Sequence, residues 1–147
     1  MSSKKTAIDM DLVLRFVNDC HSDLDSIKKL LEKEPALVNA AWDWGGGDWE
    51  TGLGAAAHMA RKDIAEYLLQ RGARIDLFAA AMLGKLAIVQ AIVADDPSVL
   101  DEPGPHGISL IAHARKGGKE ATDVLKLLQA ANKANKAEEL GTKWSII

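Results

Sequence analysis

Two carboxylates and one imidazole that could transfer protons lie near each other in the sequence. Asp48 and Glu50 end a segment with the sequence A-W-D-W-G-G-G-D-W-E (residues 41–50), and His58 follows a short distance downstream. A carboxylate beside an imidazole is the minimal set for general acid–base catalysis. His58, assisted by Asp48 or Glu50, is therefore a candidate catalytic group for an isomerisation, a cyclisation or an elimination. The spacing permits this chemistry without requiring it, and a merely exposed His58 is the alternative.

The same segment carries three tryptophans around three consecutive glycines: Trp42, Trp44 and Trp49. Glycine adopts positive φ without steric cost, so residues 45–47 predict a sharp turn. Protein interfaces are enriched in tryptophan and methionine, and small-molecule pockets are apolar with a few polar groups. The segment therefore predicts a site for a protein partner or for a small apolar or aromatic ligand. In the alternative interpretation the indoles only seal a gap in the core, and Asp43 and Asp48 cap the turn.

Two stretches of the chain share one helix–turn–helix pattern. Residues 51–76 read T-G-L-G-A-A-A-H-M-A-R-K-D-I-A-E-Y-L-L-Q-R-G-A-R-I-D, and residues 110–128 read L-I-A-H-A-R-K-G-G followed by K-E-A-T-D-V-L-K-L-L. The pattern is similar to the ankyrin repeat, T-P-L-H-x-A-A-x-x-G with L-L-x-x-G-A behind it. The resemblance covers roughly residues 12–128 and departs from the pattern where Gly52 and Gly54 replace proline and histidine. The tryptophan segment and G-P-H-G-I-S-L-I-A-H-A resemble features of a bacterial subgroup of small ankyrin proteins.

The spacing of small residues predicts how the repeats are arranged. The interval from Ala81 to Ala114 equals the ankyrin period of about 33 residues, whereas the interval from Ala57 to Ala81 is too short by a β-turn finger. We therefore expect an all-α ankyrin-repeat solenoid of about four repeats, with one finger missing before Leu77 and an enlarged, tryptophan-rich finger in the second repeat. The expected parts of this single domain are a capping repeat (1–40), a second repeat (41–76), a third repeat (77–101), a C-terminal repeat (102–136) and a tail (137–147). The expected helices cover residues 10–20, 24–32, 54–60, 62–71, 77–83, 86–94, 109–116 and 120–136.

The resemblance also implies which residues face the concave groove of the stack. By position these include His58, Met59, Met82 and Leu83. An open apolar patch formed by such residues would mark a binding site. Alternatively, the tryptophan segment folds over Met82 and Leu83 and covers them. The full set of expected ligand or partner contacts is Trp42, Trp44, Trp49, Met59, Met82, Leu83, His106, His113 and Arg115.

Several of the remaining candidates also have a structural interpretation. His106 matches the histidine of a finger tip, so we expect it to hold a turn. His113 replaces an alanine that should be packed, which favours a half-buried, hydrogen-bonded imidazole. Arg115 is expected on a solvated face that could form a rim for an acidic partner. Cys20 is expected to be a packing residue rather than a nucleophile, because the adjacent His21 would not face it on a helix.

Bulk properties exclude several classes of function. The formal net charge of -3 argues against a nucleic-acid groove, which needs clustered Lys and Arg. No apolar run approaches the roughly 20 residues of a membrane span, and no signal peptide is recognisable, so we expect a cytoplasmic protein. The single cysteine excludes an internal disulfide. The four histidines are scattered without an H-x-x-x-H or C-x-x-C pair, so we expect neither a metal site nor a cofactor.

Three hypotheses for the function follow. The first is a binding module that recognises a protein partner across the groove and the tryptophan segment. The second is a small-molecule binder or an enzyme of the isomerase, cyclase or lyase type, with its pocket between the tryptophans, Met59 and Met82. The third is a structural role without a specific site. The scaffold alone does not choose between them.

Overall fold

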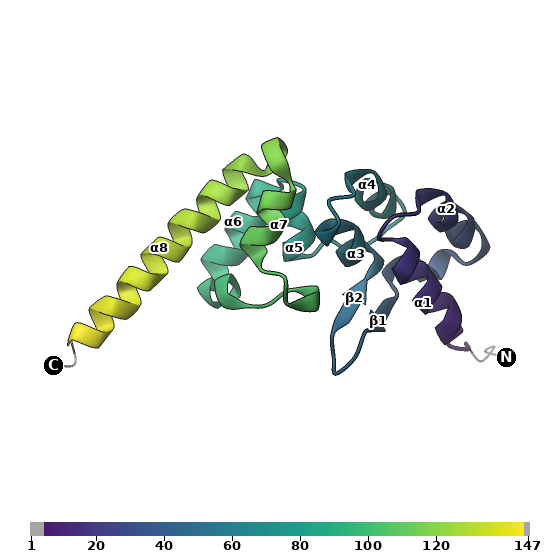
Figure 1. The fold of residues 1–147 in the computed structure, drawn as a ribbon, viewed down its shortest axis with the longest axis horizontal. Coiled ribbons are helices and arrows are strands. Elements are labelled where there is room, and N and C mark those ends of the chain that lie inside the picture. Colours follow the sequence, from purple (N-terminus) through teal and green to yellow (C-terminus); the bar gives the residue numbers. More distant parts are fainter. Residues whose placement is uncertain (1–4, 146–147) are drawn as a thin grey trace. The chain divides into compact units, whose positions relative to one another are not determined.

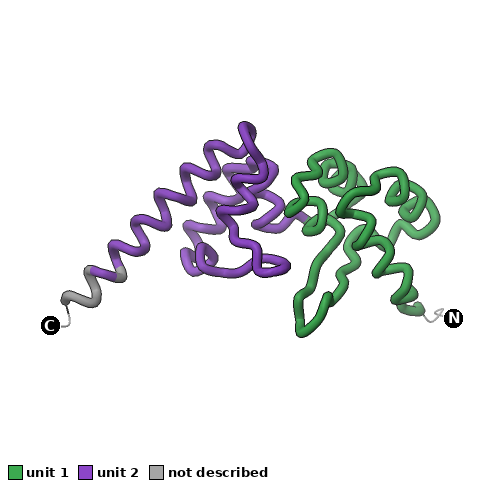
Figure 2. The backbone as a smooth tube through the Cα atoms, viewed as in Figure 1, with its two compact units in different colours: residues 1–74 green, residues 75–147 purple. Residues whose placement is uncertain are grey.

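The protein is mostly helical and divides into two compact units. The computed structural model describes residues 5–145, and within them the side chains of all residues except 139 and 141–145. The units are Met1–Arg74 and Ile75–Ile147 (Figure 2). The described residues form eight α-helices and two short strands (Figure 1), which confirms the predicted helical class.

In the first unit, a two-stranded hairpin lies in the chain between two pairs of helices. The elements are α1 (Met10–Asp19), α2 (Leu24–Lys33), a 3-10 helix (Pro35–Asn39), β1 (Ala41–Asp43), β2 (Trp49–Thr51), α3 (Gly52–His58) and α4 (Lys62–Gln70). Helix α1 contacts α2, α3 and β1, and α3 contacts α4. Aspartates begin the first two helices, because the carboxylates of Asp9 and Asp23 accept main-chain N–H groups of the first turn.

The core of the first unit forms where α1, α2, α3 and α4 turn their apolar faces inward. Its largest fully buried apolar side chains are Phe16, Ile27, Leu37, Leu53, Ile64 and Leu68. A side chain at Gly52 would place its Cβ 2.7 Å from Cys20 Sγ and 2.9 Å from the Phe16 ring. Only glycine therefore allows α3 to begin so close to α1.

The second unit contains the other four helices and three short 3-10 turns. They are α5 (Leu77–Met82), α6 (Leu86–Asp95), 3-10 turns at Pro97–Asp101, Pro105–Gly107 and Gly118–Ala121, α7 (Leu110–Lys116) and α8 (Thr122–Ser145). Helices α5 and α7 pack together, and α6 and α8 cover them to close one hydrophobic core. Its buried members include Ala80, Ala81, Val89, Leu110, Ala114, Val124 and Leu128.

The eight predicted helices are all present, with differences at their ends. Helix α3 begins at Gly52 rather than Gly54, because the Thr51 hydroxyl accepts the Gly54 N–H at 3.0 Å and caps the helix earlier. No strand is present in residues 71–76, where Gly72 at φ 98° ends one helix and Asp76 caps the next. Helix α8 extends to Ser145, beyond the predicted end at residue 136. Within the expected tail, the Trp144 side chain and residues 146–147 lie outside the described part.

None of the helices within residues 5–145 combines the length and the apolar character that a membrane span needs. The longest, α8, has 24 residues, but lysines, glutamates and asparagines interrupt it throughout.

Candidate functional site

The tryptophan segment forms a β-hairpin with a tight glycine turn. Strands β1 and β2 are antiparallel and pair Trp42 with Glu50. Residues 45–47 all have positive φ, of 137°, 65° and 90°, which confirms the turn that the glycines predict. Asp43 Oδ1 accepts the N–H groups of Gly45 at 2.9 Å and Gly47 at 3.0 Å. Asp43 is thus confirmed as a turn cap, and the main chain of Asp48 closes the turn against Trp44 and Gly45.

The alternation of side chains along β2 separates an exposed indole from a buried carboxylate. Neighbouring residues of a strand point to opposite faces. Trp49 is accordingly 62% exposed, whereas Glu50 is 1% exposed. The indole Nε1–H of Trp44 donates a hydrogen bond to Glu50 Oε1 at 3.0 Å. The hairpin therefore carries one indole outward and uses another to hold Glu50 in the interior.

Two histidines complete the surroundings of this carboxylate. His21 follows α1, and its Nε2 lies 3.2 Å from Glu50 Oε1. His58 ends α3, and its Nε2 lies 3.0 Å from Glu50 Oε2. The two imidazole rings meet edge to face with their centroids 5.0 Å apart. Each carboxylate oxygen thus faces its own imidazole, and the three side chains come from three different elements.

The contacts between these groups favour the charged forms of Glu50 and His21. Burial alone would raise the pKa of Glu50, but hydrogen bonds from His21 and His58 and the positive charge of both rings lower this pKa to about 2. The hydrogen bond to Glu50 raises the pKa of His21 against the opposing effect of burial, and the Asn18 carbonyl, 2.9 Å from His21 Nδ1, adds to the rise. The site is therefore a buried carboxylate held ionised by imidazole partners.

The shifted pKa values of Glu50 and His21 predict the pH range in which the chain, without any bound metal ion, is most stable. Glu50 has a folded pKa below its ordinary 4.5, so its stabilising effect is complete above that pH and is lost as the pH falls towards about 2. His21 has a folded pKa above its ordinary 6.5, so its effect is complete below that pH and is lost as the pH rises through the raised value. We expect the free energy of unfolding to be highest between about pH 4.5 and 6.5.

The measurement is urea unfolding of the chelator-treated chain across this pH range, with Glu50→Gln as the control. The variant cannot ionise at position 50, so the fall in stability on the acid side should be much smaller than in the wild type. An identical pH profile for the two proteins would contradict the assignment of Glu50 as the responsible group.

The structure brings together some of the predicted site residues and moves others away. His58 and Glu50 form the predicted carboxylate–imidazole pair. Met59 is 45% exposed, and Trp42 and Leu83 are partly buried. Met82, in contrast, is fully buried, so it is no part of an open apolar patch. The main-chain carbonyl of Met82 lies close to Gly117. A Cβ added at Gly117 would lie 2.1 Å from this carbonyl oxygen, so the end of α5 is tightly packed. The alternative hypothesis, in which the tryptophan segment folds over Met82, remains a prediction.

The remaining predicted residues lie in the second unit, and Cys20 lies in the first. His106 has φ 58° within the Pro105–Gly107 turn, as a turn-holding residue should. His113 is fully buried, its Nδ1 lies 2.8 Å from the Ser109 carbonyl, and its ring packs against Phe78. Arg115 is exposed at the end of α7. Cys20 is fully buried, and burial, together with the charges of Asp19 and Glu50, raises the pKa of its thiol, so it is a packing residue and not a nucleophile.

Sequence reasoning missed His21. The ankyrin resemblance implies a groove position for it, but it was not included in the predicted site. By the repeat spacing His21 corresponds to Met59 rather than to His58, so the sequence held no signal that would bring it onto Glu50. The expectation that the histidines are scattered is wrong for His21 and His58, since folding brings both onto Glu50.

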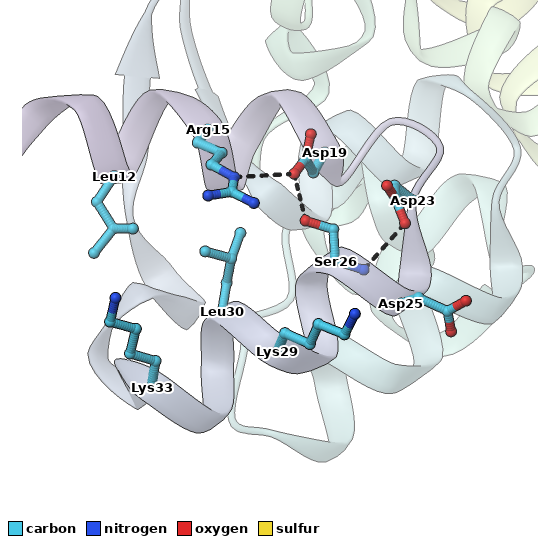
Figure 3. A pocket seen from close by; sticks show the side chains of 9 residues that line it. All are labelled: Leu12, Arg15, Asp19, Asp23, Asp25, Ser26, Lys29, Leu30 and Lys33. Carbon is cyan, nitrogen blue, oxygen red and sulfur yellow. Dashed lines mark hydrogen bonds and ion pairs between the residues drawn. The ribbon is translucent and has the colours of Figure 1, made fainter.

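Two concave surfaces of the first unit lie away from these three side chains. A cavity of about 650 Å³ opens between α1 and α2, and Figure 3 shows its charged lining, where Arg15 faces Asp19 and the Ser26 hydroxyl donates to the same carboxylate. A second cavity of about 230 Å³ is lined by Leu31, Glu32, Pro35, Tyr67 and Arg71. Neither cavity includes Glu50 or His58.

Comparison with known proteins adds no identification. No protein-family model matches the chain. No curated protein matches it either.

Proposed function

We propose that this chain is an ankyrin-type binding module whose tryptophan hairpin recognises a protein partner. The observation that carries the proposal is the contrast within β2, where Trp49 is 62% exposed beside a Glu50 that is 1% exposed. Trp49 presents a large indole to solvent, and the neighbouring Glu50 anchors the hairpin that carries it. Such an indole is well suited to contact a partner, because tryptophan is enriched among the residues that contribute most binding energy in protein interfaces. Its partner would offer an apolar pocket for that indole.

The scaffold supports this proposal. The sequence resembles the ankyrin repeat, the helices contact one another in consecutive pairs, and the hairpin precedes α3 as a finger precedes the first helix of a repeat. Ankyrin stacks bind through their fingers and the adjoining helices. Met59, 45% exposed just after α3, adds a second adaptable apolar contact on the same part of the chain.

A binding role has better support than the alternative of acid–base chemistry on a small molecule. His58 and Glu50 do form a contact of 3.0 Å, which is the pair that such chemistry needs. Glu50, however, is buried and engaged by His21, His58 and Trp44, so its geometry suits an anchor of the hairpin.

The test uses a photoreactive amino acid in place of Trp49, with the same substitution at exposed Glu66 of α4 as the control. We expect crosslinking to one protein from position 49 but not from position 66. That protein is then purified and titrated directly with the wild type and with Trp49→Ala. The affinity should fall by at least tenfold at an unchanged melting temperature, as for an interface hot spot. Equal affinities, or equal crosslinking from both positions, would overturn the proposal.

A further inference from the structure

We propose that His21, Glu50 and His58 bind one divalent transition-metal ion of the zinc type. One ligand atom of each side chain lies within 4.8 Å of the others. The closest approaches are 3.2 Å from Glu50 Oε1 to His21 Nε2 and 3.0 Å from Glu50 Oε2 to His58 Nε2. Ligands of a tetrahedral zinc ion, at about 2.1 Å from the metal, lie about 3.4 Å apart. Small side-chain shifts would therefore let an ion replace the direct carboxylate–imidazole contacts.

The set of donors matches what such an ion prefers. Two imidazole nitrogens and one carboxylate form a recurrent three-ligand zinc site, in which water occupies the remaining position. The side chains of His21 and His58 keep 20% and 11% exposure, so water can reach the edge of the site, while Glu50 closes its floor. Calcium and magnesium prefer oxygen ligands, which makes them poor occupants here.

The groups around the three ligands also fit a metal centre. A ligating histidine usually donates its second ring N–H to a carbonyl or carboxylate, and that bond orients the ring. His21 has this arrangement, since its Nδ1 lies 2.9 Å from the Asn18 carbonyl while its Nε2 points to Glu50. The Trp44 indole N–H holds Glu50 Oε1 in the same way. Both bonds would persist with an ion present, because neither uses the lone pairs that face the two imidazoles.

The three ligands are also fixed by regular structure. Glu50 lies in β2, His58 ends α3, and His21 lies two residues beyond the end of α1, which contacts α3. Movement of helix α3 away from α1 would separate Gly52 from Cys20 and Phe16, which pack closely against it. A preformed arrangement of this kind lowers the cost of ordering the ligands when the ion binds.

The experiment titrates the full-length, chelator-treated chain with Zn²⁺ by calorimetry and with Co²⁺ by visible absorption. We expect one ion per chain and the visible bands of four- or five-coordinate Co²⁺. His21→Gln and His58→Gln should each weaken binding by about a hundredfold or more, because loss of an outer-shell partner alone costs up to that much. His113→Gln, at a buried histidine of the second unit, is the matched control and should leave the affinity unchanged. Circular dichroism verifies the folding of each variant.

X-ray absorption of the zinc-loaded wild type gives a second readout that needs no substitution. We expect at least two imidazole nitrogens and one carboxylate oxygen around the ion. Absence of binding, binding that His21→Gln or His58→Gln leaves unchanged, or a first shell without imidazole would each overturn the proposal. Loss of partner binding by Trp49→Ala is measured separately, so the two proposals fail independently.

Discussion

Replacing Glu50 by alanine is expected to lower the free energy of unfolding of the first unit by about 3–5 kcal/mol. The carboxylate is 1% exposed and accepts contacts from His21, His58 and Trp44. Its removal takes away the acceptor that two largely buried imidazoles and the indole N–H of Trp44 share. Breaking a buried ion pair by deleting one partner is costly for this reason.

Urea unfolding with a chelator present measures this effect, and hydrogen exchange locates it in residues 5–74. The matched control is Glu66→Ala, which removes an exposed glutamate of α4 and should change stability by no more than about 0.5 kcal/mol. A loss at Glu50 as small as that at Glu66 would mean that the buried carboxylate does not hold the hairpin against α1 and α3.

Replacing Gly84 by alanine should destabilise the second unit by about 3 kcal/mol or more, from overpacking and backbone strain together. Gly84 has φ 72°, and an added Cβ would lie 2.2 Å from the main-chain oxygen of Glu120. A main-chain carbonyl cannot turn aside as a flexible side chain does. The turn after α5 would therefore have to separate from the segment that leads into α8.

Gly118→Ala separates these two contributions. Gly118 has φ 60°, but no atom lies within 4 Å of the position of its Cβ. Its substitution incurs only backbone strain, about 1 kcal/mol. Thermal unfolding of both variants checks the difference. Equal losses at Gly84 and Gly118 would contradict the close approach of Gly84 to Glu120.

The helices could be predicted from the sequence because their signals are local. Apolar residues at helical spacing, such as Ile64 and Leu68, and stop signals, such as Gly72, depend only on near neighbours in the chain. The hairpin turn was equally local, since three glycines and Asp43 suffice to form it. The later end of α8 was harder to predict, because its alanines, lysines and glutamates are compatible with helix long after the contacts with the core have ended.

The site could be predicted only in part. Glu50 and His58 are close in sequence, so their pairing was foreseeable once a hairpin and a helix were expected. The burial of Glu50 depends on the strand register, which decides which of two neighbours, Trp49 or Glu50, points inward. His21 approaches from a different helix pair, and no spacing rule connects it with Glu50. Met82 looked like a groove residue by position, but tight packing at the end of α5 buries it.

The most direct test of the gathering of His21 and His58 on Glu50 is long-range ¹H–¹⁵N NMR of the histidine side chains. The spectra compare chelator-treated wild type with Glu50→Gln near neutral pH, and His113 serves as the internal reference because it bonds to Ser109 in the second unit. We expect the imidazole resonances of His21 to shift towards the neutral form in the variant, because Glu50 raises the pKa of His21, and those of His58 to change because its contact with the Glu50 carboxylate is altered, with His113 unchanged. Unaltered resonances of His21 and His58 would contradict a shared contact with the buried carboxylate.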